Sequence, residues 1–358
     1  MQALTYDDVT RAANRIAGRI RRVTVAHVDP EPFSTAPSGD LAVDRRQERG
    51  QLWLVLEHLQ YTGSFKARGA QNFLASHIER GSIPNAGVTI ASGGNAGLAC
   101  AWAAQQRGVA ATVFLPTTTP SVKVSRLRGY GSAVHLVGSS YAEALTACEE
   151  FANRTGALAS HAYDDPLIAA GAGTLLDEIR EQISGLDSVV LAVGGGGLFA
   201  GVTTAARHHG VRIVAVEPQN SRALNASVEA GRIVDVDVDS IAADSLGARR
   251  ITQMALSAAQ GGAVQSVLVS DSEIIGARRA LWNDYRLVVE HGAATALAGL
   301  STPSLTATAV DPLTRGAGDS SPRYTPRPGE RVAIVLCGGN TDPSDLVVGI
   351  ARDEAAAE

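Results

Sequence analysis

One lysine in the chain lies where it could do covalent chemistry. Lys66 stands between a Thr62-Gly63 turn and the stretch ARGAQNFLASHIER, which predicts a helix. Ser64 and Phe65 come directly before it, and they offer a hydroxyl group and a flat apolar ring. A lysine whose pKa is lowered by burial or by a cationic neighbour can trap a carbonyl group. A lysine in such a sequence can equally be a solvated surface residue, and its neighbours Ser64, Phe65 and Gly69 favour a role in chemistry.

Three glycine-rich turns follow Lys66 along the chain, each beside an apolar run that predicts a strand. They are SGGNAG (92–97), GGGG (194–197) and CGGN (337–340). Backbone N–H groups in strand-to-helix turns bind phosphate and other anions. One amine, several such turns and no cluster of metal-ligand residues together indicate pyridoxal phosphate as a cofactor.

The first turn has two interpretations. Asn is a favourable N-cap residue, so Asn95 could simply cap the helix that follows it. Alternatively, the N–H groups of Ser92, Gly93 and their neighbours up to Asn95 bind a substrate carboxylate. The Asn95 amide would then form a hydrogen bond to a ring substituent of the cofactor.

The tetraglycine turn, Gly194–Gly197, also fits a different class of enzyme. Gly195, Gly197 and Ala200 match the relaxed G-x-G-x-x-A dinucleotide pattern, and Glu217 ends the next predicted strand about 20 residues later. An NAD-dependent oxidoreductase is therefore a distant alternative. Four consecutive glycines make a deeper nest of N–H groups, which suits a terminal phosphate monoester. A tight turn that binds nothing is the third possibility.

Other residue types with catalytic potential are less informative. Cys337 ends an apolar run just before Gly338, and buried cysteines are most often inert small hydrophobes. The eight histidines show no HxH or HxxxH metal spacing, and no GxSxG motif is present. The sequence therefore does not support a zinc enzyme or a serine hydrolase.

Composition limits the class of protein further. A chain of 358 residues can bury two lobes, and its 45% hydrophobic and 19% charged residues are ordinary for a globular protein. A net charge of −5 without a basic stripe argues against nucleic acid as a partner. No apolar stretch approaches the roughly 20 residues of a membrane span, and no signal-type segment opens the chain. With three widely spaced cysteines, we expect a cytoplasmic protein that does not bind membranes.

Short apolar runs alternate with longer amphipathic stretches along most of the chain, which is typical of βαβ units and parallel sheets. We therefore predict an α/β fold. Strands are predicted at 88–92, 111–116, 133–137, 188–193, 212–217, 265–270 and 332–339. Helices are predicted at 67–80, 95–106, 120–131, 140–156, 167–183, 197–210, 272–285 and 292–300, with a capped helix after Thr5. Residues 301–330, rich in Pro, Ser, Thr and Gly, predict a flexible loop.

Taken together, the motifs resemble those of the serine/threonine dehydratases, which are fold-type-II pyridoxal-phosphate enzymes, and especially the catabolic serine dehydratases. The resemblance runs from about 52 to 348, with gaps at 225–265 and 301–330. The motifs that carry it are SFKARGA, ASGGNAGLA, DDPLIAAGAGT, GGGGLFAG, VEP, VEHGAA and CGGN.

This resemblance implies a two-domain fold like that of the tryptophan synthase β subunit. Residues 1–84 and 159–358 would form a large cofactor-binding domain, and residues 85–158 a small domain that closes over the substrate. It also implies a homodimer whose substrate is a small amino acid.

The resemblance further assigns roles to the motif residues. Lys66 is the Schiff-base lysine and, once free, removes the Cα proton. Cofactor contacts come from Phe65 on the ring face, Asn95 at the ring hydroxyl, Gly194, Gly195, Gly196 and Gly197 at the phosphate, and Cys337 with Gly338 at the pyridine nitrogen. The substrate carboxylate is bound by Ser64, Ser92, Gly93 and Asn95.

The implied reaction is β-elimination from L-serine, L-threonine or a related β-hydroxy amino acid, which yields a 2-oxo acid and ammonia. Gly93 stands where serine racemases carry a hydroxyl group, which argues against racemisation. Ala223 stands where the family pattern has an acidic metal ligand. Whether the protein binds a monovalent or divalent cation therefore stays an open question, with Glu217 as the one candidate ligand. His291 and the segment ADSLG (243–247) also depart from the family pattern. They leave room for β-replacement, racemisation or dehydration of a bulkier hydroxy amino acid.

Overall fold

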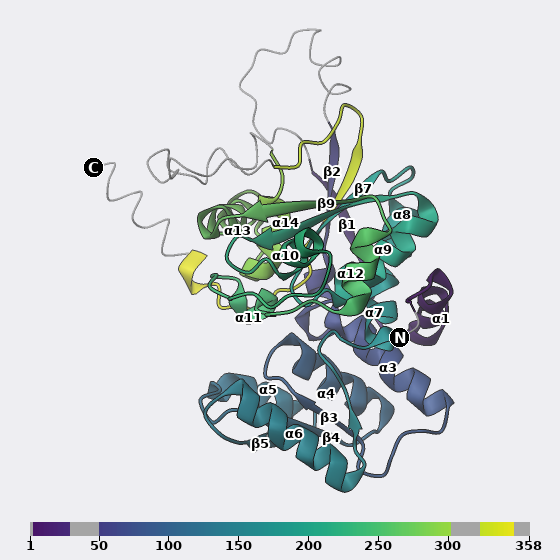
Figure 1. The fold of residues 1–358 in the computed structure, drawn as a ribbon, viewed down its shortest axis with the longest axis vertical. Helices are drawn as coiled ribbons and strands as arrows, with labels where there is room; N and C mark the ends of the chain where they lie inside the picture. Colours follow the sequence, from purple (N-terminus) through teal and green to yellow (C-terminus); the bar gives the residue numbers. More distant parts are fainter. Residues whose placement is uncertain (1–2, 29–49, 302–322, 347–358) are drawn as a thin grey trace, which may run out of the picture.

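Two parallel-rich β-sheets form the framework of the molecule. The computed structural model describes residues 3–28, 50–301 and 323–346. A six-stranded sheet has the order β1-β2-β10-β7-β8-β9, and a four-stranded sheet has the order β5-β4-β3-β6. In Figure 1 the larger sheet occupies the upper part of the view and the smaller sheet the lower part. The predicted α/β class is confirmed.

The larger sheet joins strands that lie far apart in the sequence. Among the described residues, each of its pairings is parallel except that of β1 with β2. β7 is buried along its whole length, which is typical of a central strand covered on both faces. The strands are β1 (Val25–Val28), β2 (Gln51–Val55), β7 (Ser188–Ala192), β8 (Arg212–Pro218), β9 (Val264–Val269) and β10 (Arg331–Val335).

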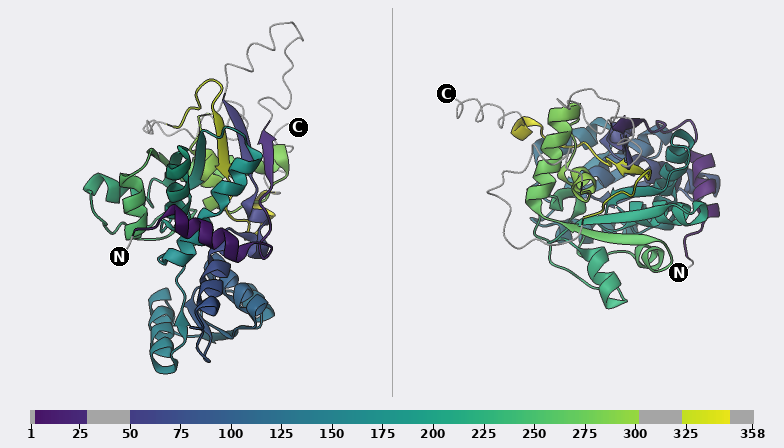
Figure 2. Two further views of the ribbon diagram at one scale, coloured as in Figure 1. Left: turned by 90° about the vertical axis from the view of Figure 1, so that its right-hand side faces the viewer. Right: turned by 90° about the horizontal axis from the view of Figure 1, so that it is seen from above.

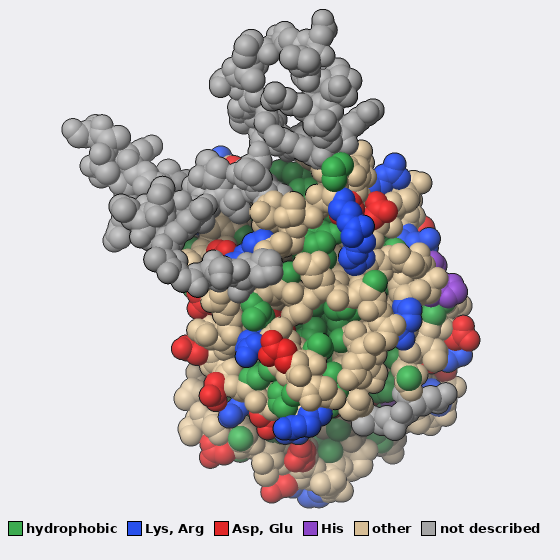
Figure 3. All heavy atoms as spheres, turned by 45° about the horizontal axis from the view of Figure 1, so that its top comes forward, with side chains coloured by type: hydrophobic (Ala, Val, Ile, Leu, Met, Phe, Trp, Pro, Cys, Tyr) green, Lys and Arg blue, Asp and Glu red, His purple; other side chains and the backbone are tan. Residues whose placement is uncertain are grey.

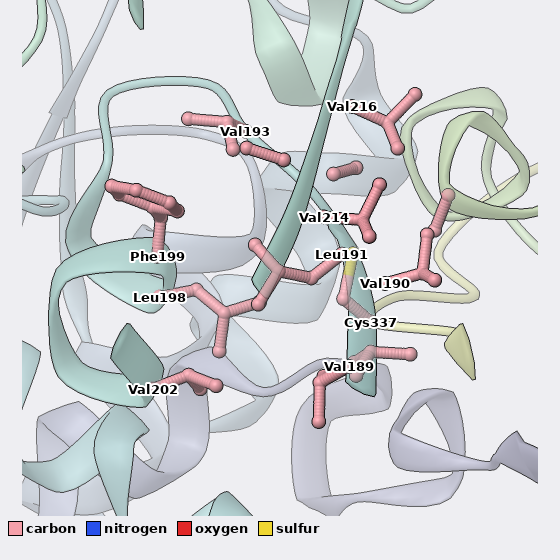
Figure 4. Close-up of a cluster of buried hydrophobic side chains, with 14 of the residues drawn as sticks. Val189, Val190, Leu191, Val193, Leu198, Phe199, Val202, Val214, Val216 and Cys337 are labelled. Atoms are coloured by element: carbon pink, nitrogen blue, oxygen red, sulfur yellow. The ribbon is translucent and has the colours of Figure 1, made fainter. Parts of the chain in front are cut away.

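Helices cover this sheet and close its core. α9 (Gly197–His209) contacts β8, and α14 (His291–Ala298) contacts β7, β8 and β10. Figure 4 shows side chains of α9 beside those of β7 and β8 in this core. The other elements of this part are α1 (Tyr6–Ile16), η1 (Glu57–Leu59), η2 (Tyr61–Gly63), α8 (Leu175–Gln182), α10 (Ala223–Ala230), α11 (Ala243–Leu246), α12 (Gln253–Gln260) and α13 (Asp271–Tyr285).

The smaller sheet is parallel and carries helices that pack on its alternating side chains. In β3 (Val88–Ala91), Val88 and Ile90 join the cluster formed with α4 (Asn95–Arg107), whereas Ala91 packs with α6 (Tyr141–Thr155). Alternate residues of a strand point to opposite faces, which explains this division. The remaining elements are β4 (Ala111–Leu115), α5 (Ser121–Gly129), β5 (Ala133–Leu136) and β6 (Leu158–Ala159).

Two helices cross closely between the sheets. α3 (Lys66–Glu79) packs against both α4 and α7 (Pro166–Gly173). A Cβ added at Gly69 would lie 2.7 Å from the Ile168 carbonyl oxygen, and one added at Gly171 would lie 2.7 Å from the Arg68 carbonyl oxygen. These glycines allow α3 and α7 to approach backbone to backbone. In Figure 2 (left), α1 lies across the same level. The start of α3 is therefore held between the two sheets.

Most of the predicted elements are present. The Thr5–Asp8 capping box is confirmed, because the Asp8 N–H donates to Thr5 Oγ1 and the Thr5 N–H donates to Asp8 Oδ2. The single helix predicted over 167–183 is wrong. It is two helices, α7 and α8, that meet at Thr174, whose hydroxyl donates to the Gly171 carbonyl oxygen at 2.8 Å.

Some elements were missed or cannot be compared. Strands β1, β2 and β6 and helices α10 to α12 were not predicted. Residues 302–322 of the predicted 301–330 loop lie outside the described residues. Its last part is described, and there Tyr324 is buried and forms a bridge with Leu300.

The surface and the helices give two further observations. Lys and Arg side chains are interspersed with Asp and Glu side chains over the face that Figure 3 shows. In the ranges that the structure describes, no helix combines the length and the apolar character needed to span a membrane.

Candidate active site

Lys66 is the first residue of α3, and a strained turn leads into it. Thr62 has φ 63°, and Gly63 has φ 78°. The Phe65 N–H donates to the Cys337 carbonyl oxygen at 3.0 Å, and Ser64 forms a bridge with Gly338. This arrangement fixes Lys66 at the carboxyl end of β10, where ligands bind in open parallel sheets.

The amine of Lys66 lies in a half-buried position between aromatic rings. Nζ donates to the Ala162 carbonyl oxygen at 2.7 Å and lies 4.8 Å from the centre of the Phe65 ring. The centre of the Tyr163 ring lies 5.9 Å from Nζ. Desolvation lowers the pKa of Lys66 to about 8, against the opposing effects of Cys337 and Glu290. A larger share of this amine is therefore neutral, and nucleophilic, near neutral pH.

Cys337 follows β10 and lies in the apolar core of the larger sheet (Figure 4). Burial raises the pKa of its thiol to about 12, and the charge of Glu290 acts in the same direction. The thiol is therefore neutral at physiological pH. It presents an uncharged group next to the lysine, where a carboxylate would present a negative charge.

Asn95 begins α4, but its side chain does not cap the helix. The N-cap residue is Gly94, and Asn95 Nδ2 donates to Glu290 Oε1 at 2.9 Å and to Oε2 at 3.0 Å. Asn340 completes the cluster, because its N–H donates to Glu290 Oε1 at 2.8 Å and its Nδ2 donates to Asn95 Oδ1 at 2.7 Å. The capping interpretation of Asn95 is therefore wrong, and its amide belongs to a polar network.

Sequence reasoning did not assign Glu290 or Asn340 to the site. Glu290 is buried, and desolvation raises the pKa of its carboxyl group, while the hydrogen bond from Asn95 opposes that shift. Both residues stand inside motifs that had been noticed, VEHGAA and CGGN. A buried acid in an otherwise apolar run was the available signal for Glu290.

The tetraglycine turn connects β7 to α9, as predicted. Gly196 has φ +92° and is the N-cap residue of α9. A Cβ at Gly195 would lie 2.4 Å from the Tyr163 ring, and one at Gly196 would lie 2.4 Å from Ala255 Cβ. The turn thus has room for backbone alone. Tyr163, which was assigned no role from the sequence, contacts this turn and also approaches Lys66.

The predicted substrate residues lie at the ends of β3 and before α3. A Cβ at Gly97 would lie 1.8 Å from the Ser92 carbonyl oxygen, so α4 starts against the end of β3. Gly93 is half-buried close to Leu115. Ser64 Oγ is fully buried and has no hydrogen-bond partner among the described residues. An unpaired buried hydroxyl costs about 1–3 kcal/mol, which a bound polar ligand would offset.

Glu217 serves a different purpose from the one expected of a metal ligand. Its Oε1 accepts from the Leu224 N–H at 2.7 Å and its Oε2 accepts from the Asn225 N–H at 2.8 Å, at the start of α10. Burial raises the pKa of Glu217 to about 8. Within the described ranges, no group of three or more His, Cys, Asp or Glu residues is arranged to hold a metal ion.

Comparison with known proteins gives consistent matches. A model of the family described as "Pyridoxal-phosphate dependent enzyme" matches residues 35–310. An L-threonine ammonia-lyase from Geobacter sulfurreducens is 34% identical over 356 residues, which cover 99% of this chain and 80% of that protein. A serine dehydratase-like protein from Homo sapiens is 35% identical over 294 residues, which cover 81% of this chain and 85% of that protein.

Solved structures resemble this fold over nearly its whole length. A T.th. threonine deaminase has a TM-score of 0.74 and 28% identity, and covers 94% of this chain and 99% of its own. A pyridoxal 5'-phosphate-dependent aspartate racemase has a TM-score of 0.78 and 26% identity, and covers 97% of this chain and 99% of its own.

Proposed function

The chain belongs to the pyridoxal-phosphate-dependent enzyme family, and from that premise we propose that it is an ammonia-lyase acting on L-serine, L-threonine or a related β-hydroxy amino acid. The substrate loses its β-hydroxyl group as water, regains water on hydrolysis, and leaves as a 2-oxo acid and ammonia. The observation that carries this proposal is the desolvated amine of Lys66 beside the neutral thiol of Cys337.

The residues present fit the coenzyme. The tetraglycine turn Gly194–Gly197 is closed to side chains and leads into α9, which has no side-chain cap; the N–H groups of its first turn lack acceptors within the helix, which suits a phosphate. In our assignment Lys66 would carry the covalent link, Phe65 would lie on the ring, and Asn95 would contact the ring hydroxyl. Cys337 and Gly338 would lie beside the pyridine nitrogen. When bound, the coenzyme supplies an electron sink for the Cα carbanion.

The chain's own groups bind the substrate and move its proton. We assign the substrate carboxylate to the unpaired Ser64 Oγ and to the N–H groups of Ser92, Gly93 and Asn95. Lys66 Nζ, with its pKa lowered to about 8, accepts the Cα proton near neutral pH. The neutral thiol of Cys337 does not stabilise positive charge on the pyridine nitrogen. That property favours β-elimination over transamination.

The remaining expectations extend this proposal. Residues 85–158 are proposed to form the small domain that closes over the substrate, and residues 1–84 and 159–358 the large one. The homodimer, the cytoplasmic location and a cation at Glu217 stay predictions. Because both Glu217 oxygens already accept backbone N–H groups, a cation there would have to share or displace them.

Product identification tests the proposal directly. The coenzyme-loaded protein is incubated with L-serine, L-threonine and bulkier β-hydroxy amino acids, and ammonia and 2-oxo acid are measured. Equal amounts of both products are expected with at least one substrate. A loaded protein whose absorbance responds to these amino acids without forming either product would contradict β-elimination.

The same incubations examine the alternatives. Chiral analysis detects racemisation, which the likeness to an aspartate racemase makes worth measuring, although Gly93 brings no hydroxyl group to the opposite face. Adding a thiol detects β-replacement. Binding of NAD by a protein that stays colourless with pyridoxal phosphate would support the oxidoreductase alternative, which family membership disfavours.

A further inference from the structure

Asn340 forms hydrogen bonds to four other residues at the candidate site, three through its side chain and one through its backbone N–H. Its Nδ2 donates to Asn95 Oδ1 and to the Thr62 carbonyl oxygen, both at 2.7 Å. Its Oδ1 accepts from the guanidinium of Arg126 at 2.7 Å, and its N–H donates to Glu290 at 2.8 Å. Asn340 therefore joins the turn before Lys66, the first residue of α4 and a residue of α5.

The partners of Asn340 fix which way round its amide lies. An arginine side chain can only donate, so the group that faces Arg126 must be the amide oxygen. A backbone carbonyl can only accept, so the group that faces Thr62 must be the NH₂. Both ends of the amide are thus set by neighbours that have no alternative role, and the amide cannot flip without losing both hydrogen bonds.

The orientation of Asn340 in turn sets that of Asn95. Because Asn340 presents its NH₂ group, Asn95 must present Oδ1 to it, and its own Nδ2 then points to Glu290. If the Asn95 amide were flipped, its Oδ1 would face the Glu290 carboxylate and its Nδ2 would face the Nδ2 of Asn340. Both contacts would be repulsive. The Asn95 amide can therefore offer a ligand oxygen only its NH₂ group, which here donates to the Glu290 carboxylate.

Backbone geometry maintains the short contacts of this network. A Cβ added at Gly63 would lie 2.7 Å from Asn340 Oδ1, and Gly63 has φ +78°. Any other residue there would push Asn340 away. Arg126 and Asn340 also line a solvent-facing pocket of about 870 Å³, so the outer end of the network is accessible.

We propose that Asn340 is a positioning residue, oriented by Arg126, that holds the Asn95 amide with its NH₂ group available to the ring oxygen of the coenzyme. This inference rests on the proposed contact between Asn95 and the coenzyme, and it is independent of which amino acid is the substrate. Because Arg126 belongs to α5 on the smaller sheet, the orientation of Asn95 also depends on that sheet being docked against the loop after β10.

Asn340→Asp tests the inner end of the network. The replacement keeps the size and the acceptor toward Arg126 but places a carboxylate oxygen against Asn95 Oδ1. We expect Asn95 to flip, so that its oxygen lies on the Glu290 side and its NH₂ group is no longer available to the coenzyme. Loss of a hydrogen bond to a charged group would weaken coenzyme binding by about tenfold or more and shift the visible absorption maximum. Both are measured by titrating apoprotein with pyridoxal phosphate, without substrate.

Arg126 tests the outer end. We expect Arg126→Ala to weaken coenzyme binding by about two- to fivefold, because only the orienting hydrogen bond is lost. Arg126→Lys, which still donates, should restore most of the affinity. Arg128→Ala is the matched control, since Arg128 is an exposed arginine on the same helix. In an Asn340→Asp background, Arg126→Ala should have no further effect.

Asn95→Ala separates this inference from its premise. If Asn95→Ala weakens binding while Asn340→Asp keeps the wild-type dissociation constant within twofold and the same absorption maximum, the positioning role is wrong. If Asn95→Ala changes neither quantity, the coenzyme contact itself is wrong and the inference falls with it. Should Asn340→Asp fail to fold, the Arg126 variants decide, because an unchanged Arg126→Ala protein would overturn the proposal.

Discussion

The Phe65 N–H donates to the Cys337 carbonyl oxygen at 3.0 Å, so two motifs from opposite parts of the chain are joined by backbone. This hydrogen bond fixes the residue before Lys66 to the loop after β10. Its effect does not depend on the side chains of either residue. The lysine and the thiol are therefore held near each other by the fold itself.

Lys66→Ala should abolish the covalent link to the coenzyme. The sequence contains only two lysines, Lys66 and Lys123, and Lys123 is exposed on α5. The visible absorption band of the loaded protein should disappear in Lys66→Ala and persist in Lys123→Ala. Borohydride treatment and peptide mapping should label the Lys66 peptide alone. A label on Lys123, or none, would refute the assignment.

The pKa of Lys66 predicts a pH dependence for coenzyme attachment. The protonated amine cannot attack an aldehyde, so the rate should fall as the pH drops below about 8. For a solvated lysine the fall would be centred near pH 10.4. Stopped-flow absorbance of apoprotein mixed with pyridoxal phosphate gives the midpoint, and free Nα-acetyl-lysine serves as the control. A midpoint near that of the free amine would contradict the desolvated position.

Local motifs were enough to propose the central residues of the candidate site from the sequence. Lys66 and the glycine turns are recognisable because their chemistry depends on neighbours in sequence, namely a turn before a helix or a strand before a nest of N–H groups. Strands β3, β4, β7, β8 and β10 were predicted because their apolar runs are continuous and almost wholly buried.

Residues that act through tertiary contacts could not be found in this way. Glu290 and Asn340 come from separate segments and contact each other only in the folded chain, and Tyr163 comes from a third segment that packs against the tetraglycine turn. The helix predicted over 167–183 is divided at Thr174, a break that the amphipathic pattern does not reveal. Strands β1 and β2 lie on one side of the larger sheet and are less buried than its central strands, so their apolar signal is weaker.

Gly195→Ala should weaken coenzyme binding by crowding the phosphate turn. The added methyl group would lie 2.4 Å from the Tyr163 ring, and overpacking of this kind costs about 1–3 kcal/mol. That range corresponds to about five- to 150-fold in the dissociation constant if the turn yields only when it binds phosphate. Gly129→Ala, where no atom lies within 4 Å of the added Cβ, is the control. If Tyr163 is the obstacle, Tyr163→Ala should restore part of the affinity.

The contribution of Cys337 to elimination activity should come from its lack of charge more than from its sulfur atom. Cys337→Ser keeps an uncharged group of similar size, so elimination activity should fall by no more than a few-fold. Cys337→Asp places a second carboxylate near Glu290, and it should lower elimination by about tenfold or more while raising transamination. Keto acid formed with and without ammonia distinguishes the two reactions. Equal activity in the two variants would show that charge at this position is unimportant.

Arg68 of α3 forms a buried ion cluster with Glu57 and Glu178, and this cluster should contribute most to the stability of α3. Arg68 is fully buried and donates to Glu57 at 2.6 and 2.9 Å and to Glu178 at 2.7 and 2.9 Å. Removing one member of a buried pair leaves an uncompensated charge, which typically costs about 3–5 kcal/mol. We therefore expect Arg68→Met to lower the free energy of unfolding by that amount, measured by urea denaturation.

A second substitution distinguishes lost charge pairing from lost packing. Burial is the main factor that raises the pKa of Glu57, and Arg68 opposes it, so without Arg68 the carboxyl group should become protonated. In an Arg68→Met background, Glu57→Gln should thus recover part of the stability, because it removes the free-energy cost of protonating a buried carboxyl group that has lost its partner. Arg11→Met, at an exposed pair with Asp8, should change the unfolding free energy by less than about 1 kcal/mol. If Arg68→Met proved no more destabilising than Arg11→Met, α3 would owe its position to apolar packing on α7 and α4 alone.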